Sequence, residues 1–291
     1  MRILITGANG QVGHALQDSL AGKGEVVALD RRQMNLANPQ QLRQVISDLQ
    51  PQIIINAAAY TAVDQAQTEP DLAMAINAHA PEVMAKEARR IGALLIHYST
   101  DYVFDGRKSG AYVESDATHA LNVYGHSKLL GEQAILAQDV PALIFRTQWV
   151  YGLRGKNFMQ TMLRLAAERD ELRVVDDQFG APTWSHTIAQ ATAGVLALGQ
   201  GQGSDWWRTH AGVYHLVAQG STSWCGFARR IVELAHLEHK PRVTGIASAQ
   251  YPTPAARPAN GRLSCDKFQQ TFFALPQWEA ELEKCMREGG L

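Results

Sequence analysis

Three glycines at regular spacing follow the first apolar run of the chain. Gly7, Gly10 and Gly13 come directly after the apolar residues 3–5, and the amphipathic stretch 11–20 follows them. A strand, a glycine turn and a helix in this order are typical of the first unit of a doubly wound α/β fold. Glycine allows a tight turn, close approach of backbone N–H groups to an anion, and close packing of helix on strand. The pattern therefore predicts a parallel sheet whose first turn holds a phosphate group.

Strand and helix patterns alternate along the first half of the chain. Strands are expected at 2–6, 25–29, 53–56, 94–99 and 142–146, and helices at 11–21, 39–49, 81–91 and 124–137. Asn38 before Pro39 has the residue types of a helix start, an N-cap followed by proline in the first turn. Such alternation predicts a Rossmann-type doubly wound parallel sheet.

The pattern is looser after about residue 150. We expect helices at 157–169, 188–198 and 223–236, a strand at 172–175, a polar loop at 199–212, and an extended loop at 252–258, which contains three prolines. The predicted division is a dinucleotide-binding domain at 1–150, which also receives elements from about 172–217, and a smaller C-terminal substrate-binding lobe made mainly of 151–291.

The residues after the second expected strand bear on the choice of dinucleotide. Asp30 follows Gly10 by about 20 residues, the position at which an acidic side chain holds the adenosine ribose and selects NADH. Arg31 and Arg32 follow it at once, and a guanidinium there can hold the 2′-phosphate of NADPH. The two signals conflict, so we expect both NADH and NADPH to be used. Asn35 is expected to contact the adenine edge.

A threonine, a tyrosine and a lysine are the candidate catalytic residues. Thr100 directly follows the buried strand 93–99, and Tyr124 and Lys128 are spaced to share one face of the following helix. A tyrosine and lysine at this spacing also describe an ordinary surface pair. With Thr100 at the sheet edge, however, they predict proton transfer to a carbonyl oxygen, with Lys128 lowering the tyrosine pKa from its usual value of about 10.

Composition excludes several other classes of function. The formal net charge is −1 and no long basic run is present, so no nucleic-acid partner is expected. Polar residues interrupt every apolar run before about 18 residues, so we expect no membrane association and a cytoplasmic location. Three separate cysteines and the pair His236 and His239 lack the spacing of a metal site.

Several segments together carry a resemblance to a known family. They are 7–13 (GANGQVG), 56–64 (NAAAYTAVD), 99–104 (STDYVF), 124–128 (YGHSK), 146–151 (RTQWVY), 180–183 (GAPT), 214–217 (YHLV) and 251–258 (YPTPAARP). The chain resembles the extended short-chain dehydrogenase/reductases and, within them, the dTDP-4-dehydrorhamnose reductase family. Sugar-nucleotide dehydratases of this fold usually place an acidic residue where this chain has Tyr102, which favours a simple reductase.

The resemblance implies an activity and a set of site residues. The activity is NAD(P)H-dependent reduction of the C4 ketone of dTDP-4-dehydro-6-deoxy-L-mannose to dTDP-L-rhamnose, used in cell-surface polysaccharide biosynthesis. The implied cofactor-binding residues are Gly7, Gly10, Gln11, Val12, Gly13, Asp30, Arg31, Asn35, Leu36, Ala59, Tyr60, Thr61, Tyr124 and Lys128. The expected substrate-binding residues are Thr100, Asp101, Trp149, Arg257 and Arg262, with Trp149 stacking on the sugar and the two arginines clamping the diphosphate.

The residues also leave two alternative functions open. The alternatives are a reductase or epimerase of another nucleoside-diphosphate sugar, and a non-catalytic NADP-binding subunit similar to the regulatory β subunit of methionine adenosyltransferase. Magnesium is not predicted, because magnesium-dependent family members carry carboxylates where this chain has residues 14–15 (His-Ala) and 185–187 (Ser-His-Thr). A homodimer is the expected assembly, and the sequence leaves open whether Trp206 and Trp207 form an interface.

Overall fold

A six-stranded, fully parallel sheet forms the larger part of the molecule. The computed structural model describes residues 1–291, and the strand order is β10-β5-β4-β3-β1-β2. The strands are β1 (Arg2–Thr6), β2 (Glu25–Leu29), β3 (Ile53–Asn56), β4 (Leu94–Thr100), β5 (Ala142–Thr147) and β10 (Gly212–His215). The chain leaves β1 for β2 on one side and then crosses to β3 on the other. The carboxyl ends of β1 and β3 therefore form the switch point at which such sheets bind ligands.

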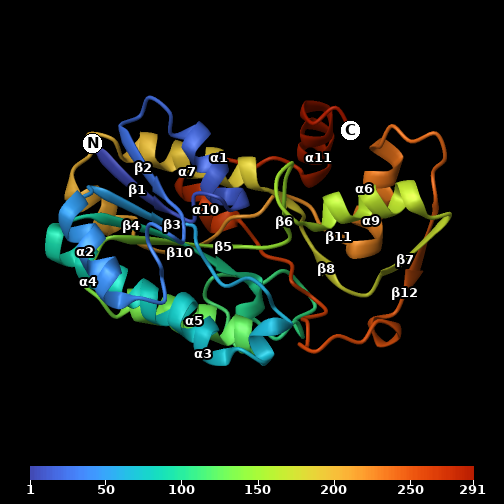
Figure 1. The fold of residues 1–291 in the computed structure, drawn as a ribbon, viewed down its shortest axis with the longest axis horizontal. Coiled ribbons are helices and arrows are strands. Elements are labelled where there is room, and N and C mark those ends of the chain that lie inside the picture. The colour runs from blue at the N-terminus through green and yellow to red at the C-terminus, as the bar shows by residue number, and fades with distance from the viewer.

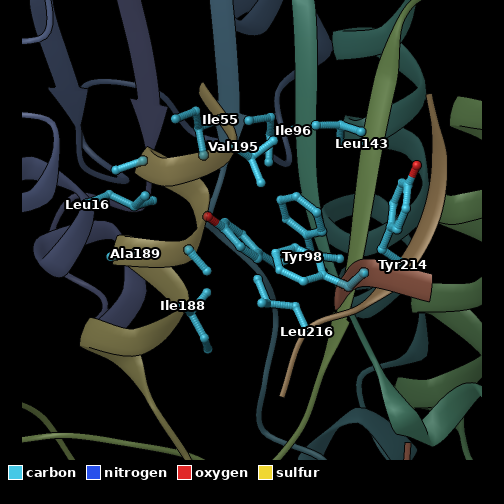
Figure 2. Close-up of a cluster of buried hydrophobic side chains, with 14 of the residues drawn as sticks. Leu16, Ile55, Ile96, Tyr98, Leu143, Ile188, Ala189, Val195, Tyr214 and Leu216 are labelled. Atoms are coloured by element: carbon cyan, nitrogen blue, oxygen red, sulfur yellow. The ribbon is translucent and has the colours of Figure 1, made fainter. Parts of the chain in front are cut away.

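Helices cover both faces of this sheet (Figure 1). One face carries α2 (Pro39–Leu49), α4 (Ala80–Ile91) and α5 (Val123–Leu136), and the other carries α1 (Gln11–Ser19), α7 (Ser185–Gly199) and α10 (Asp266–Thr271). Alternate strand residues serve the two layers, because Ile3 and Ile5 belong to one core cluster and Leu4 to another. Figure 2 shows the first cluster, in which Ile188 and Val195 of α7 face Ile55, Ile96 and other strand residues.

The C-terminal lobe has a core of its own. It contains α6 (Phe158–Glu168), β7 (Glu171–Val175), α9 (Trp224–Leu234), β12 (Arg242–Ile246) and α11 (Trp278–Glu288). Short strands lie between the lobe and the sheet: β6 (Val150–Tyr151) pairs with β9 (Thr183–Trp184), and β8 (Phe179–Gly180) with β11 (Thr222–Ser223). The chain crosses between the two parts more than once, since β7 lies in the lobe while α7 and β10 return to the sheet.

The predicted alternation of strands and helices is confirmed, with differences outside the regular pattern. The helix expected at 81–91 begins earlier, because α3 (Pro70–Met74) and a π-helical segment, Ala75–His79, run continuously into it. The prediction of a loop at 199–212 is wrong in part, since α8 (Ser204–Thr209) lies within it. Gly199 leaves room there for the indole of Trp207, which also packs against the core of the sheet.

Side-chain caps fix the starts of two helices, and the cap at Asn38 is the one that the sequence predicts. Asn38 accepts a hydrogen bond from the Gln41 N–H at 3.1 Å, and Pro39 occupies the first turn of α2. The side chain of Ser223 caps α9 in the same way, at 2.9 Å from the Gly226 nitrogen. Short one-turn helices complete the fold at η1 (Gln65–Gln67), η3 (Asp101–Val103) and η4 (Ser248–Gln250). None of the helices is both long and apolar enough to span a bilayer.

The packing of α1 on β1 yields a stability prediction. A Cβ atom at Gly13 would lie 2.1 Å from the Gly7 carbonyl oxygen, so Gly13→Ala requires the helix to move away from the turn. Forced overpacking of this kind costs about 1–3 kcal/mol, which urea denaturation would measure. Gly110→Ala is the matched control, because nothing lies within 4 Å of its Cβ position. Equal stability of the two variants would contradict the proposed contact.

Candidate active site

The glycine turn between β1 and α1 forms an open cradle. Gly7 has φ +72°, and a Cβ atom there would lie 2.9 Å from the backbone of Ala58, so both conformation and space require glycine. Helix α1 starts at Gln11 with Gly10 as its N-cap, no side chain caps it, and its first turn has no acidic residue. The free N–H groups and the positive end of the helix dipole are therefore available to a pyrophosphate, and the site fits a dinucleotide.

A cavity of about 410 Å³ extends from this turn. Its lining includes the predicted cofactor residues Gly7, Arg31, Asn35, Leu36, Ala59, Tyr60 and Thr61. The predicted residues Gly10, Gln11, Val12 and Gly13 lie at the turn and the helix start next to it. Asn35 uses its side-chain oxygen to accept from the Ala37 N–H at 3.1 Å, so its amide nitrogen is the group left to contact a base. This cavity is the candidate adenosine site.

Asp30 directly follows β2, and its carboxylate is hydrogen-bonded by the residues of the loop that it begins. Its carboxylate accepts from the backbone N–H groups of Arg32 at 2.8 Å and Gln33 at 3.2 Å. These backbone hydrogen bonds hold the pKa of the carboxyl below its usual range. The Arg32 guanidinium turns back to Asp30 at 3.3 Å, whereas Arg31 lines the cavity. The two arginines that the sequence treats as one signal thus occupy different positions.

The candidate catalytic residues lie at the carboxyl edge of β4 and the start of α5. Thr100 ends β4, and its hydroxyl donates to Asp101 at 3.1 Å and accepts from the Tyr102 N–H at 3.2 Å. Tyr124 stands in the first turn of α5, which Asn122 caps. Burial raises the pKa of Tyr124 to about 12, and Asp101 adds to this while the Thr100 hydroxyl opposes it. The tyrosine is therefore fully protonated at neutral pH.

Lys128 lies deeper than the sequence indicates. Its side chain is buried, and its Nζ donates to the Tyr98 carbonyl at 2.6 Å and faces His97 Nε2 at 3.3 Å. Burial lowers the pKa of Lys128 to about 8, opposed in part by Glu132. The predicted lowering of the Tyr124 pKa by Lys128 is not seen, because burial dominates that phenol.

The expected sugar-binding side chains gather around two glycines of the C-terminal lobe. A Cβ atom at Gly261 would lie 2.4 Å from Asp101 Oδ2, and one at Gly180 would lie 2.8 Å from the Trp149 ring. Burial raises the pKa of Asp101 to about 7. Trp149 has φ +46° and stacks on Trp224 with ring centroids 3.6 Å apart, so a sugar could use only its other face.

Gln148 is a candidate site residue that the sequence reasoning missed. It is buried, and neither its amide nitrogen nor its oxygen has a hydrogen-bond partner. A Cβ atom at Gly261 would lie 2.9 Å from its Oε1, so it borders the same space as Asp101. A buried amide without partners is costly unless a ligand completes it. Its place directly before Trp149 was the only signal in the sequence.

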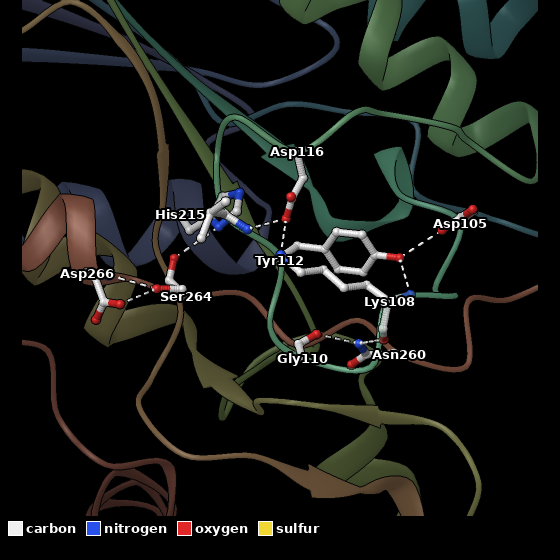
Figure 3. A network of polar contacts seen from close by, with 10 residues as sticks. Asp105, Lys108, Gly110, Tyr112, Asp116, His215, Asn260, Ser264 and Asp266 are labelled. Atoms are coloured by element: carbon white, nitrogen blue, oxygen red, sulfur yellow. Dashed lines mark hydrogen bonds and ion pairs between the residues drawn. The ribbon is translucent and has the colours of Figure 1, made fainter.

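Both arginines of the predicted diphosphate clamp have protein partners. Arg257 donates to both carboxylate oxygens of Asp64, at 3.0 and 2.7 Å, and this pair holds its pKa above the usual range. Arg262 donates to Asn260 Oδ1 at 2.8 Å and to the Ser109 carbonyl at 2.6 Å. Figure 3 shows the surrounding network, in which Asn260 also bonds the carbonyls of Lys108 and Gly110. A clamp would have to exchange these partners for phosphate oxygens.

Fold and site together define a class of protein. A glycine turn beside a cavity of about 410 Å³, with a threonine at the end of β4 and the Tyr124–Lys128 pair on α5, is the arrangement of an NAD(P)H-dependent short-chain dehydrogenase/reductase. Residues 1–290 match the family model described as the RmlD substrate binding domain.

Similarity to known proteins shows to which family of these enzymes the chain belongs. It is 46% identical to the dTDP-4-dehydrorhamnose reductase of Burkholderia thailandensis over 99% of both chains, and 44% identical to that of Escherichia coli K12 over 99% of this chain and 98% of the other. The structure superposes on the dTDP-4-dehydrorhamnose reductase of Bacillus anthracis in complex with NADP at a TM-score of 0.89, with 36% identity and 99% of both chains covered. The chain belongs to the RmlD family of dTDP-4-dehydrorhamnose reductases.

Proposed function

We propose that the chain reduces dTDP-4-dehydrorhamnose to dTDP-L-rhamnose with NAD(P)H, and that Tyr124, Lys128 and Thr100 carry the reaction. Full-length identity of 46% to a reductase of this name supports the activity. The observation that supports the three residues is that Thr100 ends β4 and its hydroxyl meets Tyr124, which shares α5 with Lys128. The bound nicotinamide supplies the hydride that reduces the C4 carbonyl.

The protein residues control the proton that must reach the C4 oxygen. Thr100 orients the carbonyl through its hydroxyl, and Tyr124 gives its phenol proton to the oxygen as negative charge develops there. A phenol with a pKa of about 12 keeps this proton until the reaction needs it. The phenolate that results is buried, so it depends on nearby positive charge. We propose that Lys128 in its ammonium form supplies this charge in the reaction, although burial dominates the pKa of Tyr124 in the cofactor-free protein. Lys128 also holds the nicotinamide ribose.

Three further side chains are proposed to recognise the sugar. Asp101, with a pKa raised to about 7, exists partly as the acid at neutral pH and can donate as well as accept hydrogen bonds. Gln148 offers an unpaired donor and an unpaired acceptor. The face of the Trp149 ring opposite Trp224 is proposed to pack against the apolar face of a 6-deoxy sugar. The reaction is proposed to need no magnesium, because residues 14–15 and 185–187 lack the carboxylates that magnesium-dependent family members carry.

A substrate panel tests this function. Purified protein with NADPH should consume the cofactor with dTDP-4-dehydrorhamnose and respond weakly to other 4-keto nucleotide sugars, as followed by absorbance. Tyr124→Phe should lower turnover by on the order of 10²-fold or more while leaving cofactor affinity intact, since only the hydroxyl is lost. Tyr214→Phe is the control, because its hydroxyl bonds the His210 carbonyl instead. Near-normal turnover in Tyr124→Phe would remove Tyr124 as the proton donor.

Cofactor preference yields a second test. Arg31 lines the adenosine cavity and Asp30 carries a negative charge beside it, so we propose that NADPH and NADH are both used. Arg31→Ala should shift the ratio of kcat/KM values toward NADH, and Asp30→Ala should shift it toward NADPH. Arg43→Ala, an exposed change on α2, should leave the ratio unchanged. If both variants move the ratio the opposite way, the assignment fails.

The diphosphate clamp can be separated from the structural role of the same arginines. Arg257→Ala and Asp64→Asn both break one ion pair and should lower stability to a similar extent. If Arg257 also binds the diphosphate, Arg257→Ala alone should weaken binding of free dTDP, measured by calorimetry. Arg262→Ala should likewise raise KM for every accepted nucleotide sugar. Unchanged dTDP affinity in both arginine variants would show that these residues only hold the loops.

A further inference from the structure

A line of buried polar side chains crosses the sheet beneath the candidate active site. Lys128 Nζ lies 3.3 Å from His97 Nε2, His97 Nδ1 lies 3.0 Å from Asn56 Nδ2, and the Thr6 hydroxyl lies 2.7 Å from Asn56 Oδ1. Each of the four side chains is almost wholly excluded from solvent. Polar groups in such a place are kept only where they satisfy one another.

Strand register produces this line. Thr6 of β1 pairs with Asn56 of β3, and Asn56 pairs with His97 of β4. Their side chains therefore stand side by side on the face of the sheet that α5 covers, and the fourth member reaches them from that helix. The line ends one residue before Gly7, at a hydroxyl that also accepts from the Ala58 N–H at 3.2 Å. It joins Lys128 to the base of the glycine turn.

The proton on His97 decides the direction of the hydrogen bonds. Burial, assisted by the charge of Lys128, lowers the pKa of His97 well below 6.5, so the ring is neutral and carries one N–H. With the proton on Nε2, Asn56 donates to Nδ1, and Nε2–H can donate only to a lysine amine. With the proton on Nδ1, Nε2 accepts from a lysine ammonium, and the Asn56 amide must turn so that its oxygen faces the ring. The lysine ammonium therefore fits only the Nδ1–H tautomer, and the Nε2–H tautomer requires the lysine amine.

We propose that His97 is a positioning residue for the reaction: its tautomer, held by Asn56 and Thr6, determines whether Lys128 carries its proton. Uptake of one proton by the pair converts lysine amine and Nε2–H imidazole into lysine ammonium and Nδ1–H imidazole, with the ring neutral throughout. His97 does not contact the substrate. It acts through Lys128, whose ammonium the proposed function requires.

The other charged groups near Lys128 do not replace His97 in this role. Glu132 lies one helical turn further along α5, but the buried guanidinium of Arg146 on β5 binds it at 2.6 Å and offsets its charge. Asp101, after β4, accepts from Thr100. Tyr124 is neutral over the range in which Lys128 titrates, because its pKa lies near 12. The one remaining side chain within hydrogen-bond reach of Nζ is His97.

Nitrogen NMR of cofactor-free protein tests the tautomer directly and does not depend on the proposed function. Protein labelled with ¹⁵N in histidine is titrated across the pKa of Lys128, which lies at about 8, and the His97 signals are assigned by their loss in His97→Gln. We expect the ring proton on Nδ1 well below this pH and on Nε2 well above it, with one midpoint. A proton that stays on the same nitrogen at both limits would overturn the proposal.

A kinetic experiment, which rests on the proposed function, compares variants that should shift the pH profile of kcat/KM in opposite directions. Asn56→Asp places a carboxylate that can only accept from Nδ1–H, so it favours the ammonium and should move the alkaline limb of kcat/KM for NADPH to higher pH. His97→Phe removes the acceptor and should move that limb to lower pH by about one unit, a tenfold change in the acid constant. His97→Gln, whose amide can still accept from Nζ, should restore part of the shift.

Thr192→Val is the matched control, because it also removes a buried hydroxyl hydrogen bond near β4, to Tyr98, without touching the line. Its pH profile should match that of the parent protein even if its melting temperature falls. The proposal would be overturned if the alkaline limb in Asn56→Asp, His97→Phe and His97→Gln lay at the same pH as in Thr192→Val and the parent protein. An inactive parent protein would instead contradict the proposed function, and the NMR titration would still decide the role of His97.

Discussion

The contact between the start of α1 and the end of β1 determines where everything else in the site can lie. Gly13 approaches the Gly7 carbonyl so closely that a single methyl group would separate helix from strand. This approach points the helix N-terminus at the space beside the switch point between β1 and β3. Arg31 lines the candidate adenosine cavity, and Thr100, a candidate catalytic residue, ends β4 next to β3 in the sheet. In the proposed function the dinucleotide bridges these two regions.

Burial sets the chemistry of the second region. The pKa of Asp101 rises to about 7, that of Tyr124 rises to about 12 and that of Lys128 falls to about 8, each chiefly because the charged form loses contact with water. All three shifts favour the neutral form. A site of this kind holds protons in place until charge appears in it, which suits a reaction that creates an alkoxide and must quench it at once.

Local sequence patterns predicted the parts of the structure that depend on neighbouring residues. The glycine turn, the strands from β1 to β5 and the Asn38 cap all follow from signals within a few positions. The sequence did not reveal the Asp64–Arg257 pair, whose members are 193 residues apart, or the stacking of Trp149 on Trp224. It also did not single out His97 or Gln148, since neither burial nor a missing partner is visible until distant strands are placed. Spacing predicted that Tyr124 and Lys128 form a pair but did not indicate the depth at which Lys128 lies.

Long-range contacts also join the C-terminal lobe to Tyr124, the proposed proton donor. Asn122 caps α5 through the Gly125 N–H at 2.8 Å and donates to the Ala256 carbonyl at 2.8 Å, in the loop that also carries Arg257. Arg257 in turn forms an ion pair with Asp64, in the segment that follows β3. The loop is therefore fixed to both sides of Tyr124, at the cap of its own helix and at the segment facing the cofactor cavity. Any movement of this loop would reach the first turn of α5 through Asn122, so the position of Tyr124, the proposed proton donor, depends on the conformation of the loop.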